Sequence, residues 1–163
     1  MNAMHKEKRT CPVCGMDAKD STIFTVYKGN EYYFCTAQCR ENFGARPRLY
    51  VGKLSVKYAG KEIIKRRSFR LEQPLKGEME HQLKDALYKM MGIRGVRVKG
   101  RNIAVTYNLL EATAEQLEQV MSDAGAALGS DWPARLKYGW VHYTEETELN
   151  NLATGRAAPP VKR

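Results

Sequence analysis

Cys11-Pro12-Val13-Cys14-Gly15-Met16 and Cys35-Thr36-Ala37-Gln38-Cys39 decide the fold, because these two stretches hold all four cysteines of the 163-residue chain. The C-x2-C spacing of the first pair allows both thiolates to lie on one tight turn and bind the same tetrahedral ion. Gly15 lets that turn adopt a positive φ. The C-x3-C pair fits a first cysteine on a loop or strand end and a second in the first turn of a helix. We therefore predict one metal site formed by Cys11, Cys14, Cys35 and Cys39.

The chemistry of this site favours a zinc ion. Four thiolates leave no open coordination position, which is typical of a structural Zn2+ site. Cu+ or iron at the same cysteines is the alternative, since both also bind soft sulfur ligands. Two short-range disulfides, or four unrelated buried thiols, are alternative interpretations of the cysteines themselves. Four thiolates on a divalent ion carry a formal charge of about −2, and nearby basic residues are available to offset it: Lys8, Arg9, Lys19 and Arg40.

The segment around the cysteines predicts a small unit over residues 11–52, preceded by a mobile N-terminus at residues 1–10. Residues 23–27 and 31–34 are rich in β-branched and aromatic side chains, which favours strands. Lys28-Gly29-Asn30 separates them as a hairpin turn. Thr36 is a typical N-cap for a short helix that ends near Gly44. A hairpin and one helix can bury little apolar surface, so a metal ion is expected to hold the unit together.

Several residues between positions 11 and 50 resemble those of a YHS/TRASH-type domain. They are Cys11 to Met16, then Tyr27-Lys-Gly-Asn-Glu-Tyr-Tyr-Phe-Cys35, then Cys39, Phe43, Pro47 and Tyr50. The resemblance implies a treble-clef-like knuckle. It also implies a role in the traffic or sensing of soft metals, since such domains occur in metal-transporting ATPases, in copper and mercury resistance proteins, and in metal-sensing regulators.

Residues 60–129 predict a second unit with the ferredoxin-like order βαββαβ, so the fold class is α+β. Apolar residues recur with helical spacing at Leu83, Leu87, Met90 and Met91. Thr113 and Gln116 form a capping box. The predicted elements are strands at 63–71, 96–98, 103–107 and 126–128, and helices at 78–91 and 113–125. Residues 53–58 are a further candidate strand in the connection between the units.

This second unit is similar to heavy-metal-associated (HMA) domains in Gly92 to Val98, Val105 to Tyr107 and Leu117 to Gly125. The resemblance implies a loop with two metal-binding cysteines before the first helix, but this part of the chain contains no cysteine. Met79 and His81 are the remaining candidates there for a weak second metal site. The unit is otherwise expected to serve as a docking or dimerising module.

Residues 130–153 predict a C-terminal helix, followed by a disordered tail at residues 154–163. Asp131 is the expected N-cap, and Pro133 lies in the first turn. Leu136, Trp140, Tyr143 and Thr147 share one face, which we expect to pack against the ferredoxin-like unit. The alternative is a partner or homodimer interface formed by that aromatic stripe together with Trp132.

The bulk properties limit the function. Residues 57–101 hold 13 Lys and Arg against 5 Asp and Glu, and the whole chain has a net charge of +9. We interpret this excess as a solvated surface, with a nucleic-acid-binding face as the alternative. No apolar run is long enough for a membrane span, and the N-terminus has no signal-peptide pattern, so we expect a cytoplasmic protein.

No catalytic motif accompanies these features, so no enzymatic activity is expected. The preferred function is heavy-metal binding as an accessory, sensor or adaptor protein, with a metal-transporting ATPase or another metal-handling protein as partner. The alternative is a zinc-ribbon-type nucleic-acid-binding regulator that uses the basic middle segment.

Overall fold

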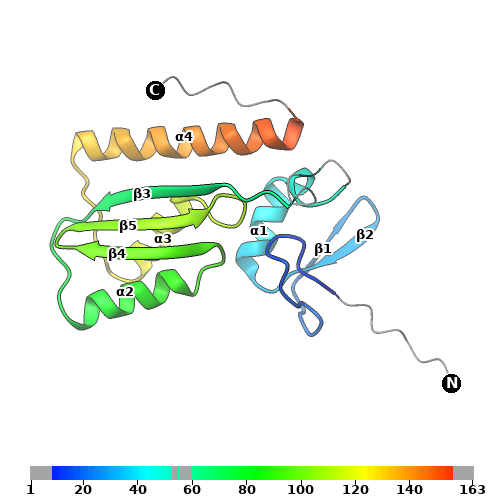
Figure 1. Cartoon of the computed structure of the whole chain (residues 1–163), viewed down its shortest axis with the longest axis horizontal. Helices are drawn as coiled ribbons and strands as arrows, with labels where there is room; N and C mark the ends of the chain where they lie inside the picture. Colours follow the sequence, from blue (N-terminus) through cyan, green and yellow to red (C-terminus); the bar gives the residue numbers. More distant parts are fainter. Residues whose placement is uncertain (1–8, 53–54, 56–59, 156–163) are drawn as a thin grey trace.

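The structure is a computed structural model that describes residues 9–52, 55 and 60–155. Two units follow each other along the chain and pack side by side (Figure 1). The predictions for residues 1–8, most of the connection 53–58 and the tail 156–163 lie outside the described residues. The elements in chain order are β1 (Phe24–Tyr27), β2 (Asn30–Tyr33), α1 (Ala37–Ala45), the 3-10 helix η1 (Pro47–Leu49), β3 (Ile64–Arg70), α2 (Glu78–Tyr88), β4 (Ile93–Lys99), β5 (Asn102–Asn108), α3 (Ala114–Asp123) and α4 (Trp132–Thr154).

The first unit contains the predicted hairpin and helix. Lys28 and Gly29 both have positive φ angles, 51° and 79°, which suits the tight turn between antiparallel β1 and β2. The Thr36 hydroxyl accepts a hydrogen bond from the backbone N–H of Cys39 and so caps α1 as predicted. Phe43 of α1 is fully buried, with its ring centroid 5.1 Å from that of Phe34. Phe43 and Phe34 therefore form the centre of this unit's core, with the rings of Tyr27 and Tyr32 from the hairpin packed against Phe43.

The second unit has a three-stranded antiparallel sheet in the described residues, with strand order β3-β5-β4. The strand predicted at 126–128 is reduced to one isolated bridge between Leu71 and Leu128. Beyond that bridge, α4 covers the outer edge of β3. Lys137 donates to the carbonyl oxygen of Ser68, and the Tyr138 hydroxyl contacts the backbone of Arg70. Side chains of a helix thus bond to backbone groups that a fourth strand would have paired.

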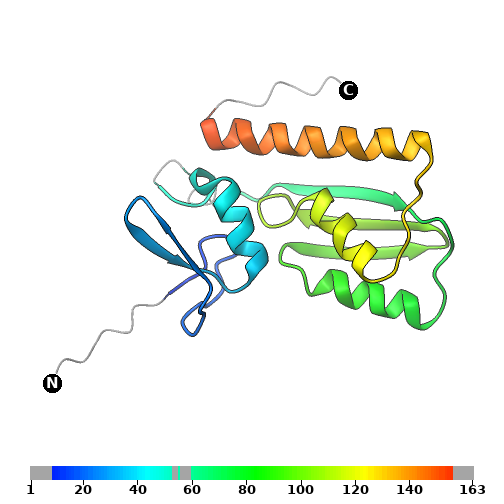
Figure 2. The ribbon, with the colours of Figure 1, turned by 180° about the vertical axis from the view of Figure 1, so that it is seen from behind.

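Helices cover one face of this sheet. The alternation along β5 buries Ile103, Val105 and Tyr107 beneath the helices. Tyr107 donates a hydrogen bond to Glu145 of α4, which places α4 on the same side as the buried row. Figure 1 shows α3 behind the strands, and Figure 2, from the opposite side, shows it in front of them. Within the described part of the chain, no helix covers the other face of the sheet (Figures 1 and 2).

The packing face predicted for α4 is wrong. Leu136, Trp140 and Tyr143 are 56%, 67% and 62% exposed, and the side chain of Trp132 lies outside the described residues. The helix instead packs through a neighbouring row: Tyr138, Val141, Glu145, Leu149 and Leu152. One of these positions, Glu145, is charged, and a search for apolar residues at helical spacing passes over it.

Candidate metal centre

The first cysteine pair lies on a tight turn that is closed by backbone hydrogen bonds within residues 11–16. The N–H of Cys11 donates to the carbonyl oxygen of Met16 at 2.8 Å, and the N–H of Gly15 donates to that of Cys11 at 2.9 Å. Gly15 has a φ of 80°, as predicted from its place after the second thiol. This arrangement fixes both sulfur atoms on the same side of the turn.

The second pair is positioned by the end of the hairpin and the start of α1. Cys35 lies two residues after the end of β2, separated from the strand by Phe34, and Cys39 lies in the first turn of α1. The N–H of Cys39 donates to the Thr36 hydroxyl at 3.3 Å, so the helix cap also positions a thiol. On the strand side, the Ser21 hydroxyl donates to the carbonyl oxygen of Phe34, next to Cys35.

The four sulfur atoms converge on one point. All of them lie within 4.8 Å of one another. The Sγ atom of Cys35 lies 3.2 Å from that of Cys14 and 3.7 Å from that of Cys39. Zn–S bonds of about 2.3 Å in a tetrahedron place the sulfurs about 3.8 Å apart, so these distances fit a bound ion. All four cysteines are free thiols, and the shortest contact joins the two pairs, which disagrees with disulfides inside each pair.

Burial and mutual contacts change the acidity of these thiols. Hydrogen bonds from Cys14 and then Cys39 lower the pKa of Cys11. The same contacts act in the other direction on their donors: the bond to Cys11 raises the pKa of Cys14 to about 12, and bonds to Cys11 and Cys14 raise that of Cys39. One thiolate can therefore be held by its neighbours' S–H groups. A cation is needed to hold four thiolates at these distances, because like charges this close repel strongly.

The basic residues predicted to offset the charge are not gathered on the sulfurs. The guanidinium of Arg9 lies 4.0 Å from the centre of the Tyr33 ring. Lys19 and Arg40 are exposed, and Lys8 lies outside the described residues. The environment of the thiols is mainly apolar instead, with Val13 and Phe34 fully buried in the same core. A low-dielectric environment strengthens the attraction between thiolates and a cation.

The helix that carries Cys39 also binds the second unit. The side-chain amide of Gln38 donates to the carbonyl oxygens of Met91 and Glu111, at 3.1 and 2.9 Å, and accepts from the N–H of Met91 at 3.2 Å. Asn42, one turn further along α1, donates to the same Glu111 oxygen at 2.6 Å. The spacing of the cysteines gave no signal for this contact, since it joins residues more than 50 positions apart.

A further connection joins the unit through Tyr50. Its hydroxyl donates to the carbonyl oxygen of Leu110 at 2.7 Å, and burial raises the pKa of this phenol. Arg46, at the end of α1, donates to the side-chain oxygen of Asn150 in α4 at 2.7 Å. The cysteine-bearing unit is thus attached to two loops of the sheet unit and to α4.

The weaker candidates lie elsewhere. Met79 is half exposed on α2, and His81 lies 3.7 Å from Asp85 on the exposed side of the same helix. Their role in a second metal site stays a prediction. Among the described residues, the cluster of three or more Cys, His, Asp or Glu side chains able to share an ion is the four-cysteine group.

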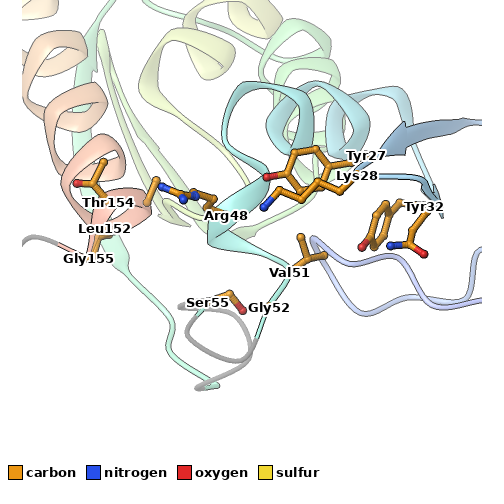
Figure 3. A pocket seen from close by; sticks show the side chains of 12 residues that line it. Tyr27, Lys28, Tyr32, Arg48, Val51, Gly52, Ser55, Leu152, Thr154 and Gly155 are labelled. Carbon is orange, nitrogen blue, oxygen red and sulfur yellow. The ribbon is translucent and has the colours of Figure 1, made fainter.

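Sequence reasoning also missed a cavity away from the cysteines. It has a volume of about 630 Å³ and lies between the hairpin and the end of α4. Figure 3 shows Tyr27 and Tyr32 on one side of it, Leu152 on the other, and Arg48 between them. Its lining comes from segments distant in sequence, which explains why no local pattern indicated it.

Comparison with known proteins agrees with the resemblance predicted for the first unit. Residues 10–54 match the family model of the YHS domain. This match contains all four cysteines and ends before the sheet unit, so the similarity of that unit to heavy-metal-associated domains stays a prediction. No curated protein and no solved structure matches the chain. In the described part of the chain, none of the helices combines the length and apolar character that crossing a bilayer requires.

Proposed function

We propose that the protein is a cytoplasmic heavy-metal-binding protein whose first unit holds one ion at Cys11, Cys14, Cys35 and Cys39. The observation that carries this proposal is the convergence of four free thiols within 4.8 Å of one another. The match of residues 10–54 to the YHS domain supports the same reading. Metal binding is the general activity that both observations indicate.

Zn2+ is the ion that we propose for the site. Four thiolates complete a tetrahedral zinc shell and leave no open position, which is typical of a structural ion rather than a catalytic one. The buried positions of Cys11 and Cys39 support this role. Cys14 and Cys35 are half-buried, which gives an incoming metal or thiol access to one side. Exchangeable Cu+ at the same sulfurs is therefore the competing proposal, and iron is the third.

Within metal handling, we propose an accessory, sensor or adaptor role without catalysis. Support comes from the resemblance of the first unit to domains of metal-transporting ATPases and resistance proteins. A site whose four ligands are all protein thiols offers no position for a substrate. The partner that we propose is a metal-transporting ATPase or another metal-handling protein. The exposed Leu136, Trp140 and Tyr143 on α4 are the surface that we propose for that contact or for a homodimer.

The test is elemental analysis of protein purified without added metal. We expect about one zinc per chain, and loss of that zinc when either cysteine pair is changed to serine. A titration with a Cu+ chelator then separates structural zinc from copper exchange. Retention of copper against the chelator supports a copper-handling site, whereas complete removal of copper rejects delivery by these cysteines. Protein that contains neither metal, with all four thiols reactive, contradicts the proposal.

A further inference from the structure

One face of the β3-β5-β4 sheet is covered by no helix among the described residues. It carries cations from β3 and β4 that are not adjacent in the sequence. Side chains alternate between the two faces of a strand. On β3 the outward row contains Arg66, Ser68 and Arg70, while Lys65 and Arg67 point to the helix side. On β4 the outward row contains Arg97 and Lys99. The alternation therefore places the basic residues of β3 on both faces of the sheet.

The two populations differ in their partners. On the helix side, Lys65 pairs with Glu148 at 2.6 Å and Arg67 pairs with Glu145 at 3.4 Å. On the open face, all four cations (Arg66, Arg70, Arg97 and Lys99) are exposed, and none forms an ion pair within the described part of the chain. Their charge is available to an external anion.

The cations form two rows, one on β3 and one on β4, and the outward side chains of β5 form a strip between the rows. β3 and β4 flank the central strand β5, so the two rows of cations lie about 10 Å apart. The strip is made of the outward residues of β5, which are small and uncharged: Asn102, Ala104 and Thr106. Register places Arg70 and Lys99 on either side of Asn102. No outward residue of the three strands is acidic among those described.

One end of this strip is hollowed. A cavity of about 320 Å³ is lined by Arg66, Arg94, Arg97, Thr106 and the ring of Tyr88. Tyr88 is half exposed, and its hydroxyl accepts a hydrogen bond from the N–H of Val96 at 3.1 Å, which holds the ring beside β4. Arg94 forms ion pairs with Glu62 and Glu111. Its side chain therefore lines the cavity, but its charge is already balanced by these carboxylates.

We propose that this face binds single-stranded nucleic acid, with the phosphates on the cations and one base against Tyr88. Three of the four free cations are arginines, whose planar guanidinium suits phosphate oxygens. The uncharged strip between the two rows of cations leaves room for a sugar–phosphate chain. The exposed ring of Tyr88 provides a surface on which a base can stack. An acidic peptide fits less well, because a peptide adding to a sheet pairs with an edge strand rather than a face. The proposal goes beyond metal binding and does not depend on which ion the cysteines hold.

The test uses the full, metal-loaded chain and fluorescence anisotropy with a labelled 15-mer of deoxythymidine. We expect salt-dependent binding, and the double variant R66A/R97A should weaken it at least about tenfold. Each lost phosphate contact lowers the slope of log K against log salt by about 0.7, so the variant's slope should fall by about 1.4. The control K76A/R135A removes the same charge from exposed positions outside the three strands, one in the connection between β3 and α2 and one on α4. It should change affinity less than about twofold.

Three further results decide the interpretation. Tyr88→Ala should weaken binding while leaving the salt slope unchanged, because stacking releases no counterions. Equal weakening by R66A/R97A and by the control would show that net charge alone is responsible and overturn the proposal. Tighter binding of a labelled poly-glutamate peptide than of the oligonucleotide would assign the face to an acidic protein instead. Zinc content measured on every variant distinguishes these results from damage to the metal site.

Discussion

The two units of this chain are stabilised by different means. In the first, a few buried aromatic and aliphatic residues such as Phe34, Phe43 and Leu49 surround four thiols. In the second, the helices and a sheet bury a continuous layer that includes Leu87, Ile103 and Leu117. A unit as small as residues 9–52 gains little from apolar burial alone, whereas the larger unit can fold on that basis. Loss of a bound metal should therefore damage the first unit and spare the second.

Metal removal should have the largest effect on the difference between the two units. Structural zinc sites contribute roughly 10–16 kcal/mol in zinc-finger peptides, which exceeds what so small a core can supply. We expect the variant C11S/C39S, or treatment with a strong chelator, to unfold residues 10–52. Hydrogen exchange followed by mass spectrometry should show lost protection there and retained protection in β3, β5 and α3. Protection returns when zinc is added back to the chelated protein.

The outcome that contradicts this expectation is equal loss of protection in both units. Such a result would mean that the sheet unit depends on the metal site for its own folding. Retained protection throughout, in protein shown to be metal-free, would mean that apolar packing around Phe43 is sufficient for the first unit.

The four-cysteine cluster was predictable from sequence because its determinants are local. The C-x2-C pair, Gly15 and the Thr36 cap act within a few residues of each other, and the structure confirms all three. The capping box of Thr113 and Gln116 is confirmed for the same reason. Patterns of this kind depend on short-range geometry, which the order of residues specifies directly.

The errors concern contacts between distant segments. The face of α4 was assigned from apolar spacing, but the helix packs partly through Glu145, whose partners Tyr107 and Arg67 lie on the sheet. The last strand was predicted at 126–128, yet only one bridge forms there, and Lys137 and Tyr138 of α4 contact the backbone of Ser68 and Arg70 at that edge. In both cases polar contacts between distant segments occur where the structure differs from the prediction. A hydrophobic pattern contains no information about such pairs.

A substitution in the apolar core should destabilise the second unit and leave the cysteine cluster unaffected. Leu117→Ala in α3 removes a fully buried side chain, and such changes cost about 2–5 kcal/mol. Denaturant unfolding followed by α-helix circular dichroism should show this loss, with the zinc content of the folded protein unchanged. Leu136→Ala is the matched control, since Leu136 is 56% exposed on α4 and should change stability by less than about 0.5 kcal/mol.

Glu145 tests whether polar packing is equally important in the second unit. Its carboxylate accepts bonds from the Tyr107 hydroxyl, from Arg67 and from the N–H of Ala114 at 2.8 Å. Burial, followed by the bond to Glu145, raises the pKa of Tyr107, which keeps the phenol protonated as a donor. In Glu145→Gln one acceptor oxygen becomes an NH2 group that faces another donor. We expect a loss of about 2 kcal/mol.

The measurement is again denaturant unfolding, with Glu146→Gln as the control. Glu146 is the next residue on α4, and its side chain is 67% exposed, so its loss should be within about 0.5 kcal/mol. If the two variants lose equal stability, the buried bonds of Glu145 contribute no more than a surface charge does.

The smallest expected effect concerns the junction between the units. Gln38→Ala removes three hydrogen bonds to the backbone of Met91 and Glu111 while leaving the adjacent Cys39 in place. The sheet unit should keep its stability, and attachment of α1 to it should weaken by about 1–2 kcal/mol, because partly buried backbone groups lose their partners. Hydrogen exchange at the N–H of Met91 should therefore accelerate, with zinc affinity nearly unchanged. Gln119→Ala, an exposed change on α3, is the control. A large drop in zinc affinity for Gln38→Ala alone would mean that docking helps to form the site, and that the two units are less independent than their cores indicate.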